Sequence, residues 1–227
     1  FGVRNHRRKH PLWLHHNCHM SNPTFKTVAV IGAGAMGRGI AQIATQSGSQ
    51  VLLYDTQAAV VEQARQSIYG QWDKMAAKGK LTAEQAQANK QRLQAASELS
   101  ALKDCDLVVE AIIERLDIKK SLFSDLEAVV REDAVLVTNT SSLSVTAIAN
   151  GAKHPARVAG YHFFNPVPLM RVVGVIAGLE TAPVVCERLM AYAKDMGHTG
   201  VMASDTPGFI VNHAGRGYGT EALRILG

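Results

Sequence analysis

A glycine-rich segment after an apolar run constrains this chain more than any other feature. Residues 28–39 read Val-Ala-Val-Ile-Gly-Ala-Gly-Ala-Met-Gly-Arg-Gly. In such a turn, Gly32 permits the sharp bend out of the strand and Gly34 lets the backbone approach a pyrophosphate. Gly37 lets the following helix pack closely on the strand. The spacing therefore predicts the first turn of a dinucleotide-binding fold.

The next segments complete this pattern. A helix is expected from about Ile40 to Ser47, and the apolar run 51–54 ends in Asp55, 23 positions after Gly32. A carboxylate there accepts hydrogen bonds from the ribose hydroxyls and repels a 2′-phosphate, so NAD is favoured over NADP. The helix N-terminus offers N–H groups to the phosphates. The alternative is a glycine-rich turn without a ligand. The predicted NAD contacts of this loop are Gly32, Ala33, Gly34, Ala35, Met36 and Gly37.

Residues 1–20 are expected to lie outside the fold, as a vector-derived leader. This segment holds four of the 24 Lys and Arg residues and five of the nine histidines, without an acid. Setting it aside leaves 20 basic against 19 acidic residues. The formal charge of +5 therefore indicates neither a nucleic-acid nor a membrane partner.

The cysteines and the apolar runs limit the class of protein. Cys105 and Cys186 are far apart, and Cys18 lies in the expected leader, so neither a disulfide framework nor metal-ligand spacing is indicated. No apolar run reaches the roughly 20 residues of a membrane span. We expect a cytoplasmic protein without a metal site.

The order of apolar runs predicts a doubly wound, mostly parallel α/β sheet of the Rossmann type. Between the second and third strands lies a polar helical stretch, about 57–96, that breaks at Lys78-Gly79-Lys80. A capping box at Thr82 and Gln85 restarts the helix, so an arm of two helices is expected, either over a ligand or as a solvated hairpin. The expected strands lie near 26–31, 50–54, 107–111, 134–138, 157–162 and 171–176.

The domain boundaries follow from the last apolar segment. Thr206 and Pro207 suit the start of a helix that runs to about Leu226. Its apolar residues have little chain left to cover them. We expect a nucleotide-binding domain over 21–205 and, over 206–227, the first helix of a truncated all-α domain.

Three polar clusters follow the nucleotide-binding pattern. They are the run Asn139-Thr-Ser-Ser142, the run His162-Phe-Phe-Asn-Pro-Val-Pro168 and the run Thr206-Pro-Gly-Phe-Ile-Val-Asn212. The first two directly follow expected strands, where ligands of parallel sheets bind. Each run alone is usually structural, as a turn, a cap or a buried histidine, but their combination indicates an active site.

Together these segments resemble the L-3-hydroxyacyl-CoA dehydrogenase family, from about Lys26 to the end of the chain. Within the family the sequence is most similar to bacterial 3-hydroxybutyryl-CoA and phenylacetate-pathway types. The segments that carry the resemblance read VAVIGAGAMGRGIA, DLVVEAIIERLDIKK, NTSSLSVTAIA, HFFNPVP and DTPGFIVN.

The resemblance implies oxidation of an (S)-3-hydroxyacyl-CoA to the 3-ketoacyl-CoA, with hydride passing to NAD. It implies that His162 is the general base and that Ser141 and Asn212 hold the reacting oxygen or the thioester carbonyl. Lys78 is a candidate for the phosphates of CoA. A homodimer formed through the helical domain is also implied. Asp55, Glu114, Lys119, Asn139, Ser141 and Asn165 are the remaining expected contacts of the cofactor.

One position departs from the family. Twelve residues beyond the catalytic histidine, where the family has a glutamate, this chain has Gly174. The family carboxylate orients the imidazole and stabilises its charged form, which glycine cannot do. Glu180 is the nearest downstream acid, but it is expected to lie beyond the strand. The departure implies impaired catalysis, unless another group substitutes for the missing carboxylate.

Two other functions remain to be weighed. A non-catalytic or structural NAD-binding protein on the same scaffold is favoured by Gly174 and opposed by His162, Ser141 and Asn212. A dehydrogenase of the hydroxyisobutyrate type would use a lysine in place of the HFFN segment. A P-loop hydrolase is excluded because no Gly-Lys-Ser/Thr follows Gly37.

Overall fold

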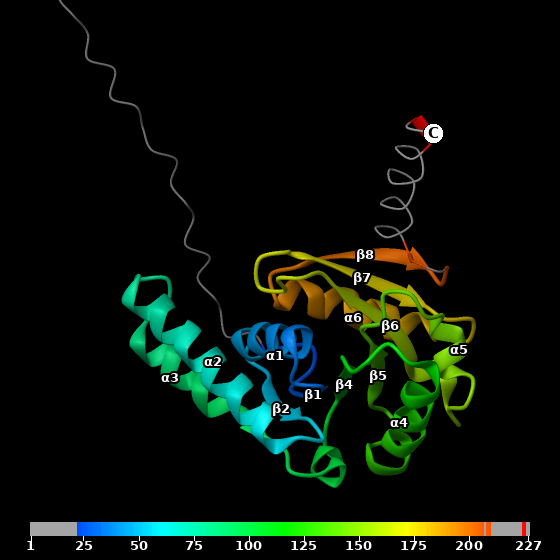
Figure 1. Ribbon diagram of the computed structural model, residues 1–227, viewed down its shortest axis with the longest axis horizontal. Helices are drawn as coiled ribbons and strands as arrows, with labels where there is room; N and C mark the ends of the chain where they lie inside the picture. Colours follow the sequence, from blue (N-terminus) through cyan, green and yellow to red (C-terminus); the bar gives the residue numbers. More distant parts are fainter. Residues whose placement is uncertain (1–21, 207, 210–223, 226–227) are drawn as a thin grey trace, which may run out of the picture.

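The computed structural model describes residues 22–206, 208–209 and 224–225. An eight-stranded sheet in the order β3-β2-β1-β4-β5-β6-β7-β8 forms its centre (Figure 1). Neighbouring strands are parallel except for β6 and β7, which are antiparallel. The predicted doubly wound, mostly parallel sheet is therefore confirmed. The strands are β1 (Thr27–Ile31), β2 (Gln50–Tyr54), β3 (Leu93–Ala95), β4 (Leu107–Glu110), β5 (Val135–Thr138), β6 (Val158–Phe163), β7 (Val172–Ala177) and β8 (Thr199–Ser204).

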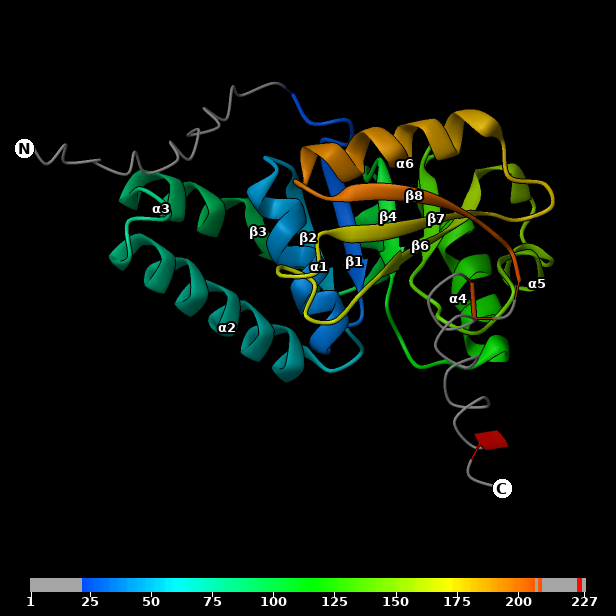
Figure 2. The same ribbon diagram turned by 90° about the horizontal axis from the view of Figure 1, so that it is seen from above.

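Helices cover both faces of the sheet (Figures 1 and 2). In β1, Val28 and Val30 belong to the core shared with α1, α2 and α6, whereas Ala29 and Ile31 belong to the core shared with α4 and α5. The two-residue alternation of the strand thus feeds two hydrophobic cores. The helices are α1 (Ala35–Gln46), α2 (Ala58–Ala77), α3 (Ala83–Arg92), α4 (Leu116–Val129), α5 (Val145–Ala149) and α6 (Pro183–Asp195), with short 3₁₀ turns η1 (Leu99–Leu102) and η2 (Pro155–Arg157).

The helical arm has the predicted turn. Helices α2 and α3 lie side by side and project from the edge of the sheet (Figure 2). Gly79 has a φ of +67° at the break, and Thr82 and Gln85 exchange the two hydrogen bonds of a capping box. The arm is shorter than expected, because α3 ends at Arg92 and residues 93–95 pair with β2 as the edge strand β3.

Three expectations about element boundaries need correction. Helix α1 begins at Ala35 rather than near Ile40, so the glycine-rich turn joins it directly. The edge strand β8 was not predicted. Gly208 and Phe209 have φ of +82° and +45°, so the helix expected from Thr206 does not begin there. Most of that helix lies outside the described residues, as does the expected leader.

Asp205 links the end of β8 to the loop that follows β5. Its carboxylate accepts hydrogen bonds from the Ser144 hydroxyl and from the backbone N–H groups of Val145 and Thr146, each at 2.8 Å. It therefore caps the N-terminus of α5. Among the described helices, none is long and apolar enough to cross a membrane.

We predict that Asp205→Ala lowers the free energy of unfolding by about 1–2 kcal/mol, the usual cost of losing a helix cap. Urea unfolding followed by circular dichroism measures this change. Asp104→Ala is the matched control, because Asp104 is exposed and accepts no side-chain hydrogen bond among the described residues. An equal effect of the two substitutions would contradict the capping role.

Candidate active site

The glycine-rich turn has the geometry that its three glycines predict. Gly32 has a φ of +97°, and an added Cβ would lie 2.5 Å from the Ala111 carbonyl oxygen. At Gly37 an added Cβ would lie 1.7 Å from the Gly32 carbonyl oxygen. At Gly34 it would meet nothing within 4 Å. The first and third glycines are therefore needed by the fold, whereas Gly34 leaves space beside the N-terminus of α1.

The N-terminus of α1 and Asp55 lie next to each other, as a dinucleotide requires. The Asp55 carboxylate, at the end of β2, accepts a hydrogen bond of 2.9 Å from the backbone N–H of Ala33. No side chain of the described residues caps α1, and the space beside its N-cap residue Gly34 is open. Unpaired N–H groups beside an open glycine and a carboxylate fit the pyrophosphate and ribose of NAD.

A cavity of about 370 Å³ opens at the carboxyl ends of the strands. It brings together seven of the predicted site residues, from α1, α4, β6 and the loops after β4, β5 and β6. Met36, Glu114, Lys119, Asn139, Ser141, His162 and Asn165 line it, with Ala111, Ile112, Phe163 and Phe164. Asn212 lies outside the described residues. No cluster of metal ligands occurs among the residues that the structure covers.

His162 sits near the end of β6 and is 7% exposed. Its ring packs against Phe164 and Phe209, with centroid distances of 4.6 and 5.6 Å. Burial lowers the pKa of this imidazole, and the Glu114 carboxylate opposes that effect. Within the described part of the chain, no group forms a hydrogen bond with the imidazole. Among the described residues, the ring is therefore placed by aromatic packing and not by a polar partner.

Gly174 lies directly opposite His162 in the antiparallel pair β6–β7. A Cβ at position 174 would be 3.6 Å from the Cβ of His162 and 3.4 Å from its nearest atom, Ile176 Cδ1, which are ordinary contacts. Position 174 thus has room for a side chain on the same face of the sheet as the histidine. Glu180 lies three residues beyond the end of β7 and is exposed, as expected.

A buried ion pair lies at the back of the cavity. Lys119 Nζ donates a hydrogen bond of 2.5 Å to Glu110 Oε1, and both side chains are almost fully buried. Glu110 also accepts hydrogen bonds from the Thr138 hydroxyl and from the backbone N–H of Ile112. Sequence reasoning missed Glu110, although an acid that ends an apolar strand nine residues before a lysine was a usable signal.

Glu114 holds the loop that carries Ser141. One of its carboxylate oxygens accepts hydrogen bonds from the Thr140 hydroxyl, from the backbone N–H groups of Ser141 and Ser142, and from the Ser142 hydroxyl. Partial burial acts to raise the pKa of this carboxyl. The hydrogen-bond donors and the Lys119 ammonium together act more strongly in the other direction, so the pKa lies below its usual range. Glu114 is therefore a charged carboxylate that fixes the loop.

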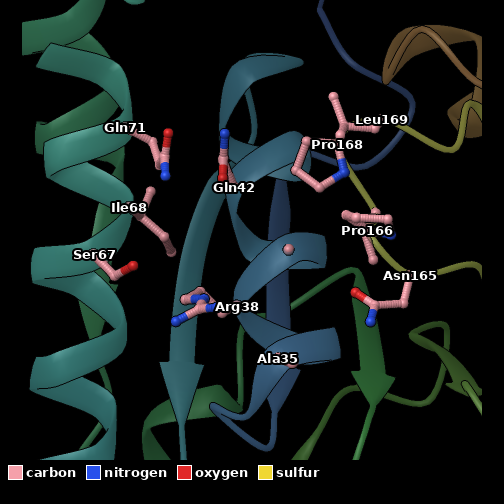
Figure 3. A pocket seen from close by; sticks show the side chains of 12 residues that line it. Ala35, Arg38, Gln42, Ser67, Ile68, Gln71, Asn165, Pro166, Pro168 and Leu169 are labelled. Atoms are coloured by element: carbon pink, nitrogen blue, oxygen red, sulfur yellow. The ribbon is translucent and has the colours of Figure 1, made fainter. Parts of the chain in front are cut away.

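A second hollow, of about 280 Å³, lies between α1, α2 and the segment after β6 (Figure 3). Arg38 and Gln42 of α1 face Ser67, Ile68 and Gln71 of α2 across it, and residues 165–169 form the third side. Lys78 is exposed at the end of α2 and does not line this hollow. It lies seven residues after Gln71, which is two helical turns along the same face.

Comparison with known proteins gives consistent matches. Residues 27–206 match the family model described as "3-hydroxyacyl-CoA dehydrogenase, NAD binding domain", which confirms NAD as the cofactor. The chain is 47% identical over 201 residues to the 3-hydroxyadipyl-CoA dehydrogenase of Escherichia coli K12, covering 88% of this chain and 42% of that relative. It is 40% identical to a probable 3-hydroxybutyryl-CoA dehydrogenase of Deinococcus radiodurans, covering 81% of this chain and 66% of that relative.

The solved structures agree with these matches. The crystal structure of a 3-hydroxybutyryl-CoA dehydrogenase from Escherichia coli K12 superposes with a TM-score of 0.87 at 47% identity. The match covers 89% of this chain and 43% of that structure. This chain therefore spans less than half the length of the Escherichia coli proteins that it matches.

We predict that alanine affects stability at one glycine of the turn and NAD binding at another. Gly37→Ala should lower the free energy of unfolding by about 2 kcal/mol or more, because its Cβ collides with backbone. Gly34→Ala should leave the stability of the cofactor-free chain unchanged, since φ is −66° there and the space is open. It should weaken NAD binding at least about tenfold, because the Cβ takes up the space of the pyrophosphate.

Thermal unfolding measures the stability of each variant, and calorimetric titration measures its affinity for NAD. Each variant serves as the control for the other. Unchanged NAD affinity in Gly34→Ala would show that the cofactor does not approach the turn at this glycine.

We predict that acid selectively reduces the stability contributed by His162. The folded-state pKa of the imidazole is lowered by burial, so the unfolded chain binds its proton first. The stability contributed by the neutral ring is present above the unfolded pKa of about 6.5 and is lost as the pH falls through the folded pKa. The parent chain should therefore lose more stability than His162→Gln between pH 8 and pH 5.5.

Thermal unfolding midpoints of both proteins at the two pH values test this sign. The two proteins differ at position 162 alone, so the contributions of the rest of the chain cancel in the comparison. A larger acid loss in His162→Gln than in the parent would show that the folded chain favours the charged imidazole.

Proposed function

Because the chain belongs to the 3-hydroxyacyl-CoA dehydrogenase family, we propose that it oxidises a 3-hydroxyacyl-CoA to the 3-ketoacyl-CoA. The observation that carries this proposal is the cavity that His162, Ser141 and Asn139 share with the glycine-rich turn. One wall can hold the nucleotide while another presents a buried, neutral base to the substrate.

The proposed chemistry needs one proton and one hydride to leave the same alcohol. His162 takes the hydroxyl proton, and its burial keeps the imidazole neutral and ready to accept it near neutral pH. The nicotinamide of NAD, where bound, would supply the hydride acceptor for the same carbon. Ser141, and Asn212 from the segment outside the described residues, hydrogen-bond the reacting oxygen or the thioester carbonyl and fix the carbon in place.

The residues that would hold NAD divide between two ends of the site. The N–H groups of the α1 N-terminus would bind the pyrophosphate. Asp55 would accept hydrogen bonds from the ribose hydroxyls and repel a 2′-phosphate. Glu114, Lys119, Asn139 and Asn165 surround the nicotinamide end. Support for this division comes from the cavity, which all four of these residues line together with Met36.

The CoA portion of the substrate fits the hollow between α1 and α2 (Figure 3). Arg38 is the cation that lines this hollow, and Asn165 is shared with the catalytic cavity, so the two spaces adjoin. Lys78 lies further along α2 and can reach phosphates that extend along the arm. The relatives' names differ in the acyl group, so we propose the class 3-hydroxyacyl-CoA and no chain length. Pairing with a second copy of the chain stays a prediction.

A specific observation favours one alternative function. The imidazole of His162 has no hydrogen-bond partner among the described residues, and position 174 provides no carboxylate. A chain of this kind could bind NAD without catalysing the oxidation.

Turnover of a Gly174 variant separates these functions. Gly174→Glu should raise turnover by about 10²–10⁴, using the effect of an orienting carboxylate in a serine-protease triad as a guide. Oxidation of NADH with acetoacetyl-CoA measures this change, and calorimetry should show unchanged NAD affinity. His162→Ala in the Gly174→Glu background should abolish most of the gain.

Gly174→Gln is the matched control, because it fills the same space without a charge and should restore much less turnover. Equal turnover in the parent, Gly174→Glu and Gly174→Gln would show that no carboxylate acts on His162 from this position. NAD binding without turnover in any of these proteins would support the binding-only alternative.

A further inference from the structure

The charged groups that face His162 are few. Among the described residues lining the cavity, the ionisable side chains besides His162 are Glu114 and Lys119. The neighbouring strand β7 presents Gly174, and the rings that contact the imidazole are those of Phe164 and Phe209. Among the described residues, Glu114 is therefore the one carboxylate that lines the cavity together with the histidine.

The position of Glu114 is fixed by its hydrogen bonds. The oxygen Oε1 accepts from Thr140, Ser141 and Ser142, and Oε2 lies 3.4 Å from Lys119 Nζ. These donors also keep the carboxyl charged, because they hold its pKa below the usual range although partial burial acts to raise it. A carboxylate held in this way can act on the cavity as a fixed charge.

Lys119 does not cancel the charge of Glu114. Its ammonium is 2.5 Å from Glu110 Oε1, which is closer than the 3.4 Å that separates it from Glu114 Oε2. Glu110, Lys119 and Glu114 together carry one excess negative charge. Lys119 and Glu110 are almost fully buried, whereas the side chain of Glu114 is 36% exposed, so water screens this excess charge in part.

We propose that Glu114 supplies the negative charge that stabilises protonated His162, in a chain whose position 174 cannot do so. This role of Glu114 in catalysis rests on the proposed function, in which His162 is the general base. Glu114 acts on the base through space and does not touch the substrate. Its negative charge stabilises the positive charge that forms on the imidazole when His162 takes the hydroxyl proton. Burial of His162 lowers its pKa, and the charge of Glu114 counteracts this.

The direct test is an NMR titration of the His162 ring in the cofactor-free chain. We expect the titration midpoint to move to lower pH in Glu114→Gln, which keeps a carbonyl oxygen for the loop donors but removes the charge. Glu114→Asp, which keeps the charge, should titrate closer to the parent. Glu180→Gln is the matched control, because Glu180 is exposed beyond β7, and it should leave the midpoint unchanged.

A folded Glu114→Gln chain whose His162 midpoint equals that of the parent overturns the proposal. If Glu114→Gln lacks a native amide spectrum, Glu114→Ala provides the same test without a hydrogen-bonding side chain. An unchanged midpoint in a folded Glu114→Ala chain likewise overturns the proposal. An equal downward shift in Glu180→Gln also overturns it, since the effect would then not depend on the cavity.

Turnover with acetoacetyl-CoA separates this proposal from the proposed function. We expect Glu114→Gln to lose about tenfold or more in turnover in the parent, because a weaker base accepts the proton less readily. The loss should be smaller in the Gly174→Glu background, where a second carboxylate acts on the ring. A shifted midpoint in a chain without turnover rejects the proposed function alone, whereas turnover with an unshifted midpoint rejects the role of Glu114 alone.

Discussion

The buried ion pair between Lys119 and Glu110 is the interaction on which the site depends. Removing both charges from water is costly unless they meet each other and their remaining hydrogen bonds are satisfied. Lys119 comes from α4, Glu110 ends β4, and Thr138, which donates to the same carboxylate, ends β5. The pair therefore joins a helix to two neighbouring strands at the edge where the cavity opens.

Strand register then determines which side chains share this edge. Glu110 pairs with Ile31 of β1 on one side and with Thr138 of β5 on the other. Thr138 pairs in turn with Gly160 of β6, and His162 follows two residues later. Backbone pairing thus brings together the glycine-rich turn after β1, the loop that carries Ser141 after β5, and His162 in β6. These three segments are far apart in the sequence.

Much of this arrangement could be predicted because the signals are local. The glycine spacing of the turn at Gly32 and the capping box at Thr82 are each recognised from residues within a few positions of each other. The strand β8 could not be predicted in this way, because its residues are mostly exposed and it is held by pairing with β7. The contact of Phe209 with the base was missed for a related reason, since it joins residues 47 positions apart in the chain.

The turn at Gly208 and Phe209 also shields the base from water. Asp205 holds the end of β8 to α5 through three hydrogen bonds. Just beyond it, the ring of Phe209 packs on His162. An aromatic ring against an imidazole keeps water away from it, and a drier environment disfavours the charged form of a histidine. The course of the backbone at the end of β8 thus contributes to the basicity of one side chain.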